Sequence, residues 1–296
     1  AVTCTSGNVA AEQVAENTIA LLDLCDRSDI EVALGRREPL TRPLMTAPET
    51  HGPKGIGYAT LPQPSRGVSQ RHSADLIIEE AHRAPGEVTL ITLAPLTNLA
   101  VALEREPKLP QLLKNLVMMA GSYRSPGNTA PTSEWNVACD PEAMQAVLSA
   151  WEGADGVSRP VALGLDVTER AKFLPDHLAQ LHATAGNPDN NRVLRFIDDA
   201  LRFYMEFHSR YDGFYGAFIH DPLAVASALD PSLLETEALP VQMELSGTLT
   251  TGETVTDWRR VWGKAPNLDI GVSADIETFF ARFIERVGGL AARTAS

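Results

Sequence analysis

The stretch Val88-Thr89-Leu90-Ile91-Thr92-Leu93-Ala94-Pro95-Leu96-Thr97-Asn98 holds the pattern that decides the fold. Its first six residues are apolar or β-branched, which is the length and composition of a buried strand. Helical patterns separate this strand from similar runs at Ala1 to Ser6, Glu31 to Leu34, Leu116 to Ala120 and Val161 to Leu165. Strands that alternate with helices form a mainly parallel sheet with helices on both faces, so the sequence predicts an α/β fold.

Capping signals predict several of the helices. Ser73 can cap the segment that follows it, and Asp140-Pro141-Glu142 combines a cap, a first-turn proline and an acid suited to the helix dipole. A longer helix is predicted from about Asp189 to His208. In the last third, apolar patterns predict three strands and a closing helix, at Val241 to Leu245, Thr254 to Trp262, Leu268 to Val272 and Asp275 to Val287.

No shift in composition and no linker divides the chain, so we expect one domain over residues 1–296. The longest irregular segment, Leu40 to Ser73, is rich in proline and glycine. Loops of that length are usually functional or mobile.

The composition excludes some classes of partner. A net charge of -13 argues against nucleic acid, because binding a polyanion requires clustered Lys and Arg. No apolar run approaches the ~20 residues of a membrane span. The three cysteines, Cys4, Cys25 and Cys139, are far apart and suit reduced thiols, which predicts a cytoplasmic protein.

Polar or turn residues follow four of the predicted strands, at Gly7-Asn8, Pro95 to Asn98, Gly121-Ser122 and Asp166. In open α/β sheets, ligands bind beyond the carboxyl ends of the strands. We therefore expect these four strand ends to converge on one ligand site. Neither GxxxxGK[ST] nor GxGxxG occurs, so nucleotide phosphates and dinucleotide cofactors are not implied.

The triplet His220-Asp221-Pro222 precedes an apolar helical run. One interpretation makes Asp221 a helix cap and His220 a buried, satisfied histidine. The other directs a metal ligand and a proton donor into one cleft, because the two side chains leave the same helix start. The local pattern leaves both open.

A second polar cluster, Asn128, Glu134 and Asn136, lies in a loop with Trp135. Two amides and a carboxylate suit vicinal hydroxyl groups, which need both donors and acceptors. The alternative is a solvated surface loop.

Three further residues have two interpretations each. His51 either turns inward from a glycine-rich flap or lies in a surface turn, which the local pattern favours slightly. Tyr211 and Tyr215 either stack on a base or pack along a helix, since their spacing is four.

Taken in order, eight short segments resemble the nucleoside hydrolases of the inosine-uridine type from residue 1 nearly to the C-terminus. These segments are Thr5-Ser6-Gly7-Asn8, His51-Gly52, Ala94-Pro95-Leu96-Thr97-Asn98, Met118-Met119-Ala120-Gly121, Glu134-Trp135-Asn136, Asp140-Pro141-Glu142-Ala143, Gly164-Leu165-Asp166-Val167-Thr168 and His220-Asp221-Pro222. The resemblance implies an open, Rossmann-like nucleoside hydrolase fold, a bound Ca²⁺ ion and hydrolysis of the N-glycosidic bond of a ribonucleoside, by a calcium-bound water, to free base and ribose. It also implies nucleoside salvage and assembly as a homodimer or homotetramer.

The resemblance assigns roles to individual residues. Asp221 and the main-chain carbonyl of Leu93 would be calcium ligands, and His220 would protonate the leaving base. His51 would lie near that base, and Met119 would pack beneath the sugar. The ribose hydroxyls would be held by Asn8, Asn128, Glu134 and Asn136.

The base preference has two interpretations under this resemblance. An imidazole proton donor at His220 fits members that accept both purines and pyrimidines. Stacking on Trp258 or Trp262 would instead select purines.

The family's Asp-rich turn, of the form DxDxGxDD, is absent from the chain. The segment at Ala1 resembles the family's second strand, so we expect the domain to be N-terminally incomplete, lacking the first strand and helix. The sheet would then lack a central strand. The alternative function is a non-catalytic nucleoside or ribose binder that lost the Asp-rich turn.

Overall fold

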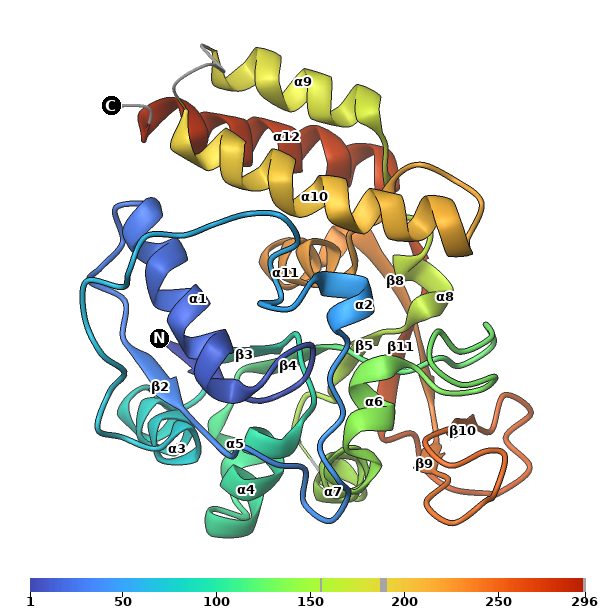
Figure 1. Ribbon diagram of the computed structural model, residues 1–296. Coiled ribbons are helices and arrows are strands. Elements are labelled where there is room, and N and C mark those ends of the chain that lie inside the picture. Colours follow the sequence, from blue (N-terminus) through green and yellow to red (C-terminus); the bar gives the residue numbers. More distant parts are fainter. Residues whose placement is uncertain (155, 187–190, 295–296) are drawn as a thin grey trace.

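The computed structural model in Figure 1 describes residues 1–154, 156–186 and 191–294. Its main sheet has five strands, in the order β3 (Thr89–Thr92), β4 (Asn115–Met119), β5 (Val161–Leu163), β11 (Leu268–Ala274) and β8 (Leu234–Leu239). The first four are parallel, and β8 is an antiparallel edge strand. The predicted α/β fold with a mainly parallel sheet is therefore confirmed.

Two further strands form a separate parallel pair. β1 (Val2–Cys4) pairs with β2 (Val32–Leu34), and among the described residues no ladder joins β1 to β3. Asn98 connects the two sheets instead: its Nδ2 donates to Cys4 O at 2.9 Å, and its Oδ1 accepts from Arg36 N at 3.0 Å. The parallel strands are thus divided into two sheets at this point.

Helices cover both faces of the main sheet, as predicted. Leu116 and Met118 of β4 pack in one apolar cluster, with helices that include α3 (Ser73–Arg83), α4 (Thr97–Arg105) and α7 (Pro141–Trp151). The alternate residues, Val117 and Met119, pack in a second cluster on the other side. That cluster is formed with α9 (Pro175–Ala185), α10 (Arg192–Tyr211), α11 (His220–Leu229) and α12 (Ile276–Arg293). The two-residue alternation of strand side chains produces both layers.

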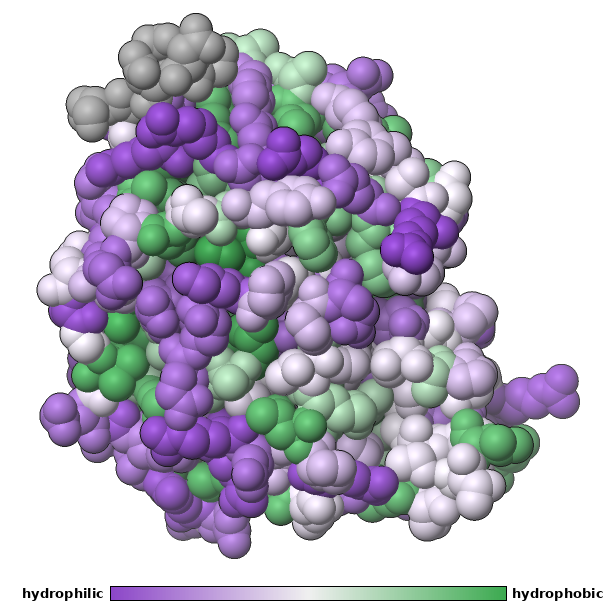
Figure 2. Space-filling view, in the orientation of Figure 1, coloured by the Kyte–Doolittle hydropathy of each residue, from purple (hydrophilic) through white to green (hydrophobic). Residues whose placement is uncertain are grey.

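The remaining elements are short, apart from one helix beside the β1–β2 pair. They are α1 (Ala11–Leu24), α2 (Pro48–His51), α5 (Leu109–Leu112), α6 (Trp135–Cys139), α8 (Leu165–Thr168), β6 (Lys172–Phe173), β7 (Ala217–Phe218), the 3₁₀ turn Pro231–Leu233, β9 (Val241–Met243) and β10 (Thr254–Thr256). On the face seen in Figure 2, α10 carries mainly hydrophilic residues, in agreement with its exposed Arg195, Arg202, Glu206 and Arg210. Within the described ranges, no helix has the length and apolar character needed to cross a membrane.

Two local predictions are wrong. Ser73 does not cap α3: it is the first helical residue, its hydroxyl donates to Ala33 O at 3.0 Å, and His72 accepts the capping bond from Ala74. The strand predicted from Thr254 to Trp262 ends at Thr256, because Asp257 accepts a hydrogen bond from Trp262 N at 2.6 Å and closes a turn.

Other local predictions are confirmed. Asp140 caps α7 by accepting from Ala143 N at 3.1 Å. The closing helix exists and continues to Arg293. The long helix predicted from about Asp189 to His208 is present as α10, which begins at Arg192. Asp189 itself lies outside the described residues.

Candidate active site

A cavity of about 750 Å³ lies at the carboxyl ends of the parallel strands. The segments of β1, β3 and β4 reach it through Asn8, Leu93 and Met119. The fourth predicted strand end does not reach it. Asp166, after β5, instead accepts hydrogen bonds from three successive backbone N–H groups of residues 123–125, at 2.9, 2.7 and 3.0 Å. Three strand ends therefore converge, and the fourth supports a loop.

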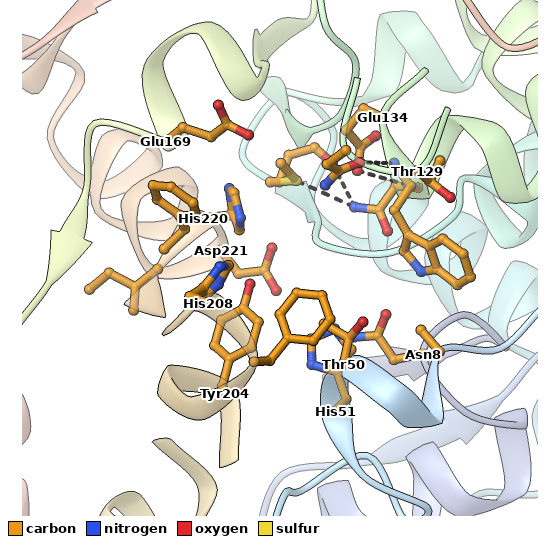
Figure 3. Close-up of a pocket in the computed structure, with 18 of the residues that line it drawn as sticks. Asn8, Thr50, His51, Thr129, Glu134, Glu169, Tyr204, His208, His220 and Asp221 are labelled. Atoms are coloured by element: carbon orange, nitrogen blue, oxygen red, sulfur yellow. Dashed lines mark hydrogen bonds between the residues drawn. The ribbon is translucent and has the colours of Figure 1, made fainter. Parts of the chain in front are cut away.

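The fold brings most of the predicted site residues together. Those that line the cavity are Asn8, His51, Leu93, Met119, Asn128, Glu134, Trp135, Asn136, Tyr211, His220 and Asp221. Tyr215 is not among the lining residues and is 47% exposed. Trp258 and Trp262 also lie outside this cavity. Figure 3 shows Glu134 on one side of the cavity, and His220 with Asp221 on the other.

Glu134 is a buried N-cap. Its carboxylate accepts from the backbone N–H groups of Asn136 at 2.8 Å, Gly121 at 3.0 Å and Val137 at 3.1 Å. Burial nevertheless raises the pKa of Glu134 to about 7, because removing a charge from water outweighs the three hydrogen bonds. The solvated-loop interpretation is wrong for Glu134 and for Asn136, which are 2% and 8% exposed.

The two asparagines each keep one polar atom free of bonds within the described residues. Asn136 Nδ2 donates to Met119 O at 3.0 Å, so its Oδ1 remains. Asn128 Oδ1 accepts from Trp135 N at 2.9 Å, so its Nδ2 remains, and this residue is exposed. One acceptor and one donor are thus available beside the Glu134 carboxylate, which suits hydroxyl groups.

Thr168 holds the imidazole of His220. The Thr168 hydroxyl lies 2.8 Å from His220 Nδ1 and itself donates to Gly164 O at 3.1 Å. The hydroxyl oxygen therefore accepts from Nδ1–H, and Nε2 is the nitrogen left for a ligand. Burial, together with the nearby imidazoles of His208 and His51, lowers the pKa of His220 to about 3.

Asp221 lies in the first turn of α11 but does not cap it, since no cap hydrogen bond from its side chain exists. The cap interpretation is therefore wrong. Burial, together with the charge of Glu134, raises the pKa of Asp221 to about 7. A carboxylate in this position is costly unless a cation or a hydrogen-bond donor joins it.

His51 faces the cavity from α2, so the surface-turn interpretation is wrong. Its ring centroid lies 5.2 Å from that of Tyr204, and burial lowers its pKa to about 4. Tyr211 also lines the cavity, 61% exposed, with its ring 4.7 Å from Phe207.

The family model described as inosine-uridine preferring nucleoside hydrolase matches residues 1–281. This chain belongs to that family. The nucleoside hydrolase is 33% identical to the pyrimidine-specific ribonucleoside hydrolase RihA of Enterobacter sp. (strain 638), over 99% of this chain and 90% of the relative. It is 32% identical to the inosine-uridine preferring nucleoside hydrolase of Crithidia fasciculata, over 97% of this chain and 89% of the relative. The family consists of glycosidases that act on nucleosides.

Solved structures agree with this assignment. The nucleoside hydrolase superposes on the purine-preferring ribonucleoside hydrolase from Gardnerella vaginalis with a TM-score of 0.89. The two chains are 27% identical, over 98% of this chain and 90% of that one. An inosine-guanosine nucleoside hydrolase gives a TM-score of 0.83 at 27% identity, over 96% of this chain and 90% of that one.

The described residues of the nucleoside hydrolase do not provide a full calcium site. They contain no group of three or more His, Cys, Asp or Glu side chains able to hold a metal ion. Asp221 and the Leu93 carbonyl line the cavity, but calcium takes six to eight oxygen ligands. These residues alone therefore do not fit the ion that the resemblance implies.

Sequence reasoning missed one wall of the nucleoside hydrolase cavity, which is formed mainly by α10 and the turn after α8. Tyr204, His208 and Asp212 recur at a spacing of four, which places them on one face of the helix. This four-residue periodicity could have identified the wall from the sequence. The missed lining residues include Tyr204, Phe207, His208, Asp212, Glu169 and Phe218.

His208 is the most enclosed member of that wall, at 4% exposed. Its Nδ1 lies 2.7 Å from Asp212 Oδ2, and its Nε2 is buried without a hydrogen-bond partner among the described residues. Burial lowers the pKa of His208, while Asp212 opposes this shift.

Proposed function

We propose that this chain hydrolyses the N-glycosidic bond of ribonucleosides and releases a free base and ribose. The observation that carries the proposal is one cavity with two different walls (Figure 3). Glu134, Asn136 and Asn128 offer hydroxyl-binding groups on one wall, and histidines with aromatic rings form the other. Relatives named ribonucleoside hydrolases support it.

The ribose is proposed to lie against the Glu134 wall. Asn8, Asn128 and Asn136 would bond its hydroxyl groups, Met119 would pack beneath the ring and Trp135 would cover it. Glycoside hydrolysis passes through an oxocarbenium-like transition state, so the sugar gains positive charge as the bond breaks. Carboxylates at Glu134 and Asp221 would stabilise that charge.

The base is proposed to lie between His220, His51 and Tyr211. When the glycosidic bond breaks, its electron pair goes to the base nitrogen, and the oxygen of a water molecule bonds to the anomeric carbon and releases one proton to the solvent. His220, which is neutral with its proton on Nδ1, would first take up a proton from the solvent on Nε2 and pass it to the base nitrogen, so that the base leaves neutral. Because Thr168 holds the other ring nitrogen, the ring has one orientation for this transfer.

Calcium is the proposed cofactor: Asp221 and the Leu93 carbonyl would be among the groups that hold it, and a bound ion would orient the ribose hydroxyls and lower the pKa of the attacking water. Since these two residues supply at most three of the six to eight oxygens that calcium takes, we expect this chain to bind Ca²⁺ no more tightly than about 1 mM. Isothermal titration calorimetry measures this affinity, with Asp221→Asn as the control that removes the one carboxylate. Micromolar binding would show that a fuller ligand set is present.

We further propose that residues 1–296 act as one domain of a cytoplasmic salvage enzyme that forms a homodimer or homotetramer. Sedimentation velocity measures the assembly, and a monomer across micromolar concentrations contradicts that part.

The central experiment incubates the chain with inosine, uridine, adenosine and cytidine and measures base and ribose by chromatography. Equal amounts of base and ribose support hydrolysis. Binding of an intact nucleoside without release supports the alternative, a binder that lost catalysis. The absence of both binding and release contradicts each of the two.

A further inference from the structure

Glu169 is a carboxylate of the cavity that has no hydrogen-bond partner among the described residues, as is also true of Glu49 and Asp221. Glu169 directly follows α8, one residue after the threonine that holds His220, and is half-buried. Figure 3 shows its side chain on the His220 side, directed toward the interior of the cavity. Its backbone N–H bonds to Leu165 O at 3.2 Å, but its side-chain oxygens are left for a ligand.

The other charged groups nearby are already engaged or act against Glu169. Asp212 on the same wall is bonded to His208 at 2.7 Å. The Lys172 ammonium lies 4.7 Å and 5.6 Å from the ring centroids of Phe214 and Phe218 and has no ion pair with Glu169. Burial, followed by the charges of Asp212 and Asp166, raises the pKa of Glu169, and Lys172 opposes this only in part. The base side of the cavity is therefore rich in hydrogen-bond acceptors.

We infer that Glu169 accepts a hydrogen bond from the exocyclic amino group of the base, so that the site prefers cytosine and adenine to uracil and hypoxanthine. The inference rests on the proposed function, and it names the substrate class of the same site. An amino group at this position donates to a carboxylate, whereas the carbonyl oxygen that replaces it in uridine or inosine is an acceptor and is repelled. Recognition of a polar substituent discriminates more strongly than a difference in size, because the wrong base leaves a polar group unpaired.

Two nucleoside pairs isolate this substituent: cytidine against uridine, and adenosine against inosine. At pH 8, chosen because the pKa of Glu169 is raised, we expect kcat/KM to favour the amino member of at least one pair by about 10-fold or more. Glu169→Gln keeps the shape but offers an N–H donor, so the ratio should fall about 10-fold. Glu49→Gln removes the same charge from a different element of the cavity, α2, and its ratio should match that of the native chain.

The dissociation constants of the same four nucleosides, measured by calorimetry, separate the two proposals. If nucleosides are cleaved but Glu169→Gln leaves the amino-to-oxo ratio unchanged, the inference is overturned and the proposed function stands. If nucleosides bind without being cleaved, hydrolysis fails, and the ratio of dissociation constants decides the inference in the same way. If none binds, both are overturned.

Discussion

At the scale of the residue, the chemistry of His220 depends on the threonine beneath it. The Thr168 hydroxyl accepts a hydrogen bond from Nδ1–H and donates one to Gly164 O, which leaves Nε2 as the reactive nitrogen. The imidazole is neutral in the free protein at pH 7, because burial lowers its pKa to about 3. A proton on Nε2 would therefore be a strong acid, suited to a poor leaving group.

Replacement of His220 by Ala should reduce kcat for inosine by about 10²-fold, the usual scale for loss of a general acid. A riboside with p-nitrophenolate as leaving group needs no proton, so its kcat should change far less. Steady-state kinetics on the two substrates checks the expectation. Thr168→Val removes the hydroxyl that holds the imidazole ring, so kcat for inosine should fall about 10-fold. Thr168→Ser keeps a hydroxyl at this position and should retain the native kcat. Equal losses on both substrates would remove His220 from the proton transfer.

Asp221 should make stability depend on pH in chelator-containing buffer. Its pKa is raised from about 3.9 in the unfolded chain to about 7 in the folded one. A raised pKa contributes stability that is present below pH 4 and lost as pH rises through 7. Asp221→Asn does not titrate, so its stability relative to the native chain should rise by about 4 kcal/mol between pH 4 and pH 8.

Urea unfolding of both chains across this range measures the difference. Asp176→Asn, exposed on α9, controls for loss of a charge and should show no such trend. A difference between Asp221→Asn and the native chain that stays constant with pH would mean that the Asp221 carboxyl is not buried as described.

At the scale of the element, the residue that caps α6 both stabilises this helix and lines the cavity. The helix has five residues, too few for a stable helix by itself, and Glu134 satisfies two N–H groups at its start and one from the loop after β4. The same side chain lines the cavity. The residue proposed to contact ribose is thus held in place by the helix that it caps.

Replacement of Glu134 by Ala should lower the free energy of unfolding by about 2 kcal/mol, because three backbone donors lose their acceptor. Glu134→Gln retains an acceptor oxygen and should lose less stability, while nucleoside affinity should fall in both variants. Urea unfolding and calorimetric binding of inosine measure the two effects separately. Native stability in the Ala variant would contradict the capping role.

Local sequence patterns explain which strands and helices could be predicted. Strands such as the partly buried β3 and the buried β4, and the cap of α7, follow from local periodicity and turn chemistry. β8 was missed because its residues Leu234–Leu239 are half polar, as an edge strand of the sheet can be. Helices α6 and α8 were missed because such short helices depend on distant partners, and local propensity is weak over four or five residues.

At the scale of the whole molecule, the buried side chain of Asn98 links the β1–β2 pair to the main sheet. Asn98, 5% exposed, bonds Cys4 O and Arg36 N across the division between β1 and β3. Asn8, which follows β1, reaches the cavity from the smaller sheet. The completeness of the site therefore depends on this link.

Asn98→Ala should increase hydrogen exchange at the amides of Gly35 and Arg36 by about 10-fold or more beyond its effect on global stability, because local opening of the β1–β2 pair becomes easier. Exchange followed by mass spectrometry measures it. Asn267→Ala is the matched control, since this buried amide bonds Val241 N and O at 2.8 and 3.0 Å on another side of the core. Equal exchange in the two variants would show that Asn98 does not link the sheets.

The sequence by itself determined the alternation of strands and helices, the location of a ligand site at the strand ends and 11 of the 24 residues that line it. These follow from local periodicity, turn residues and short motifs in order. Only the tertiary structure decided that Glu134 is a cap, that His51 faces inward, that Tyr215 lies outside the cavity and that α10 and Glu169 complete the wall. The reason is physical: each depends on contacts between distant segments, as between Thr168 and His220, 52 positions apart, and no local pattern specifies such pairs.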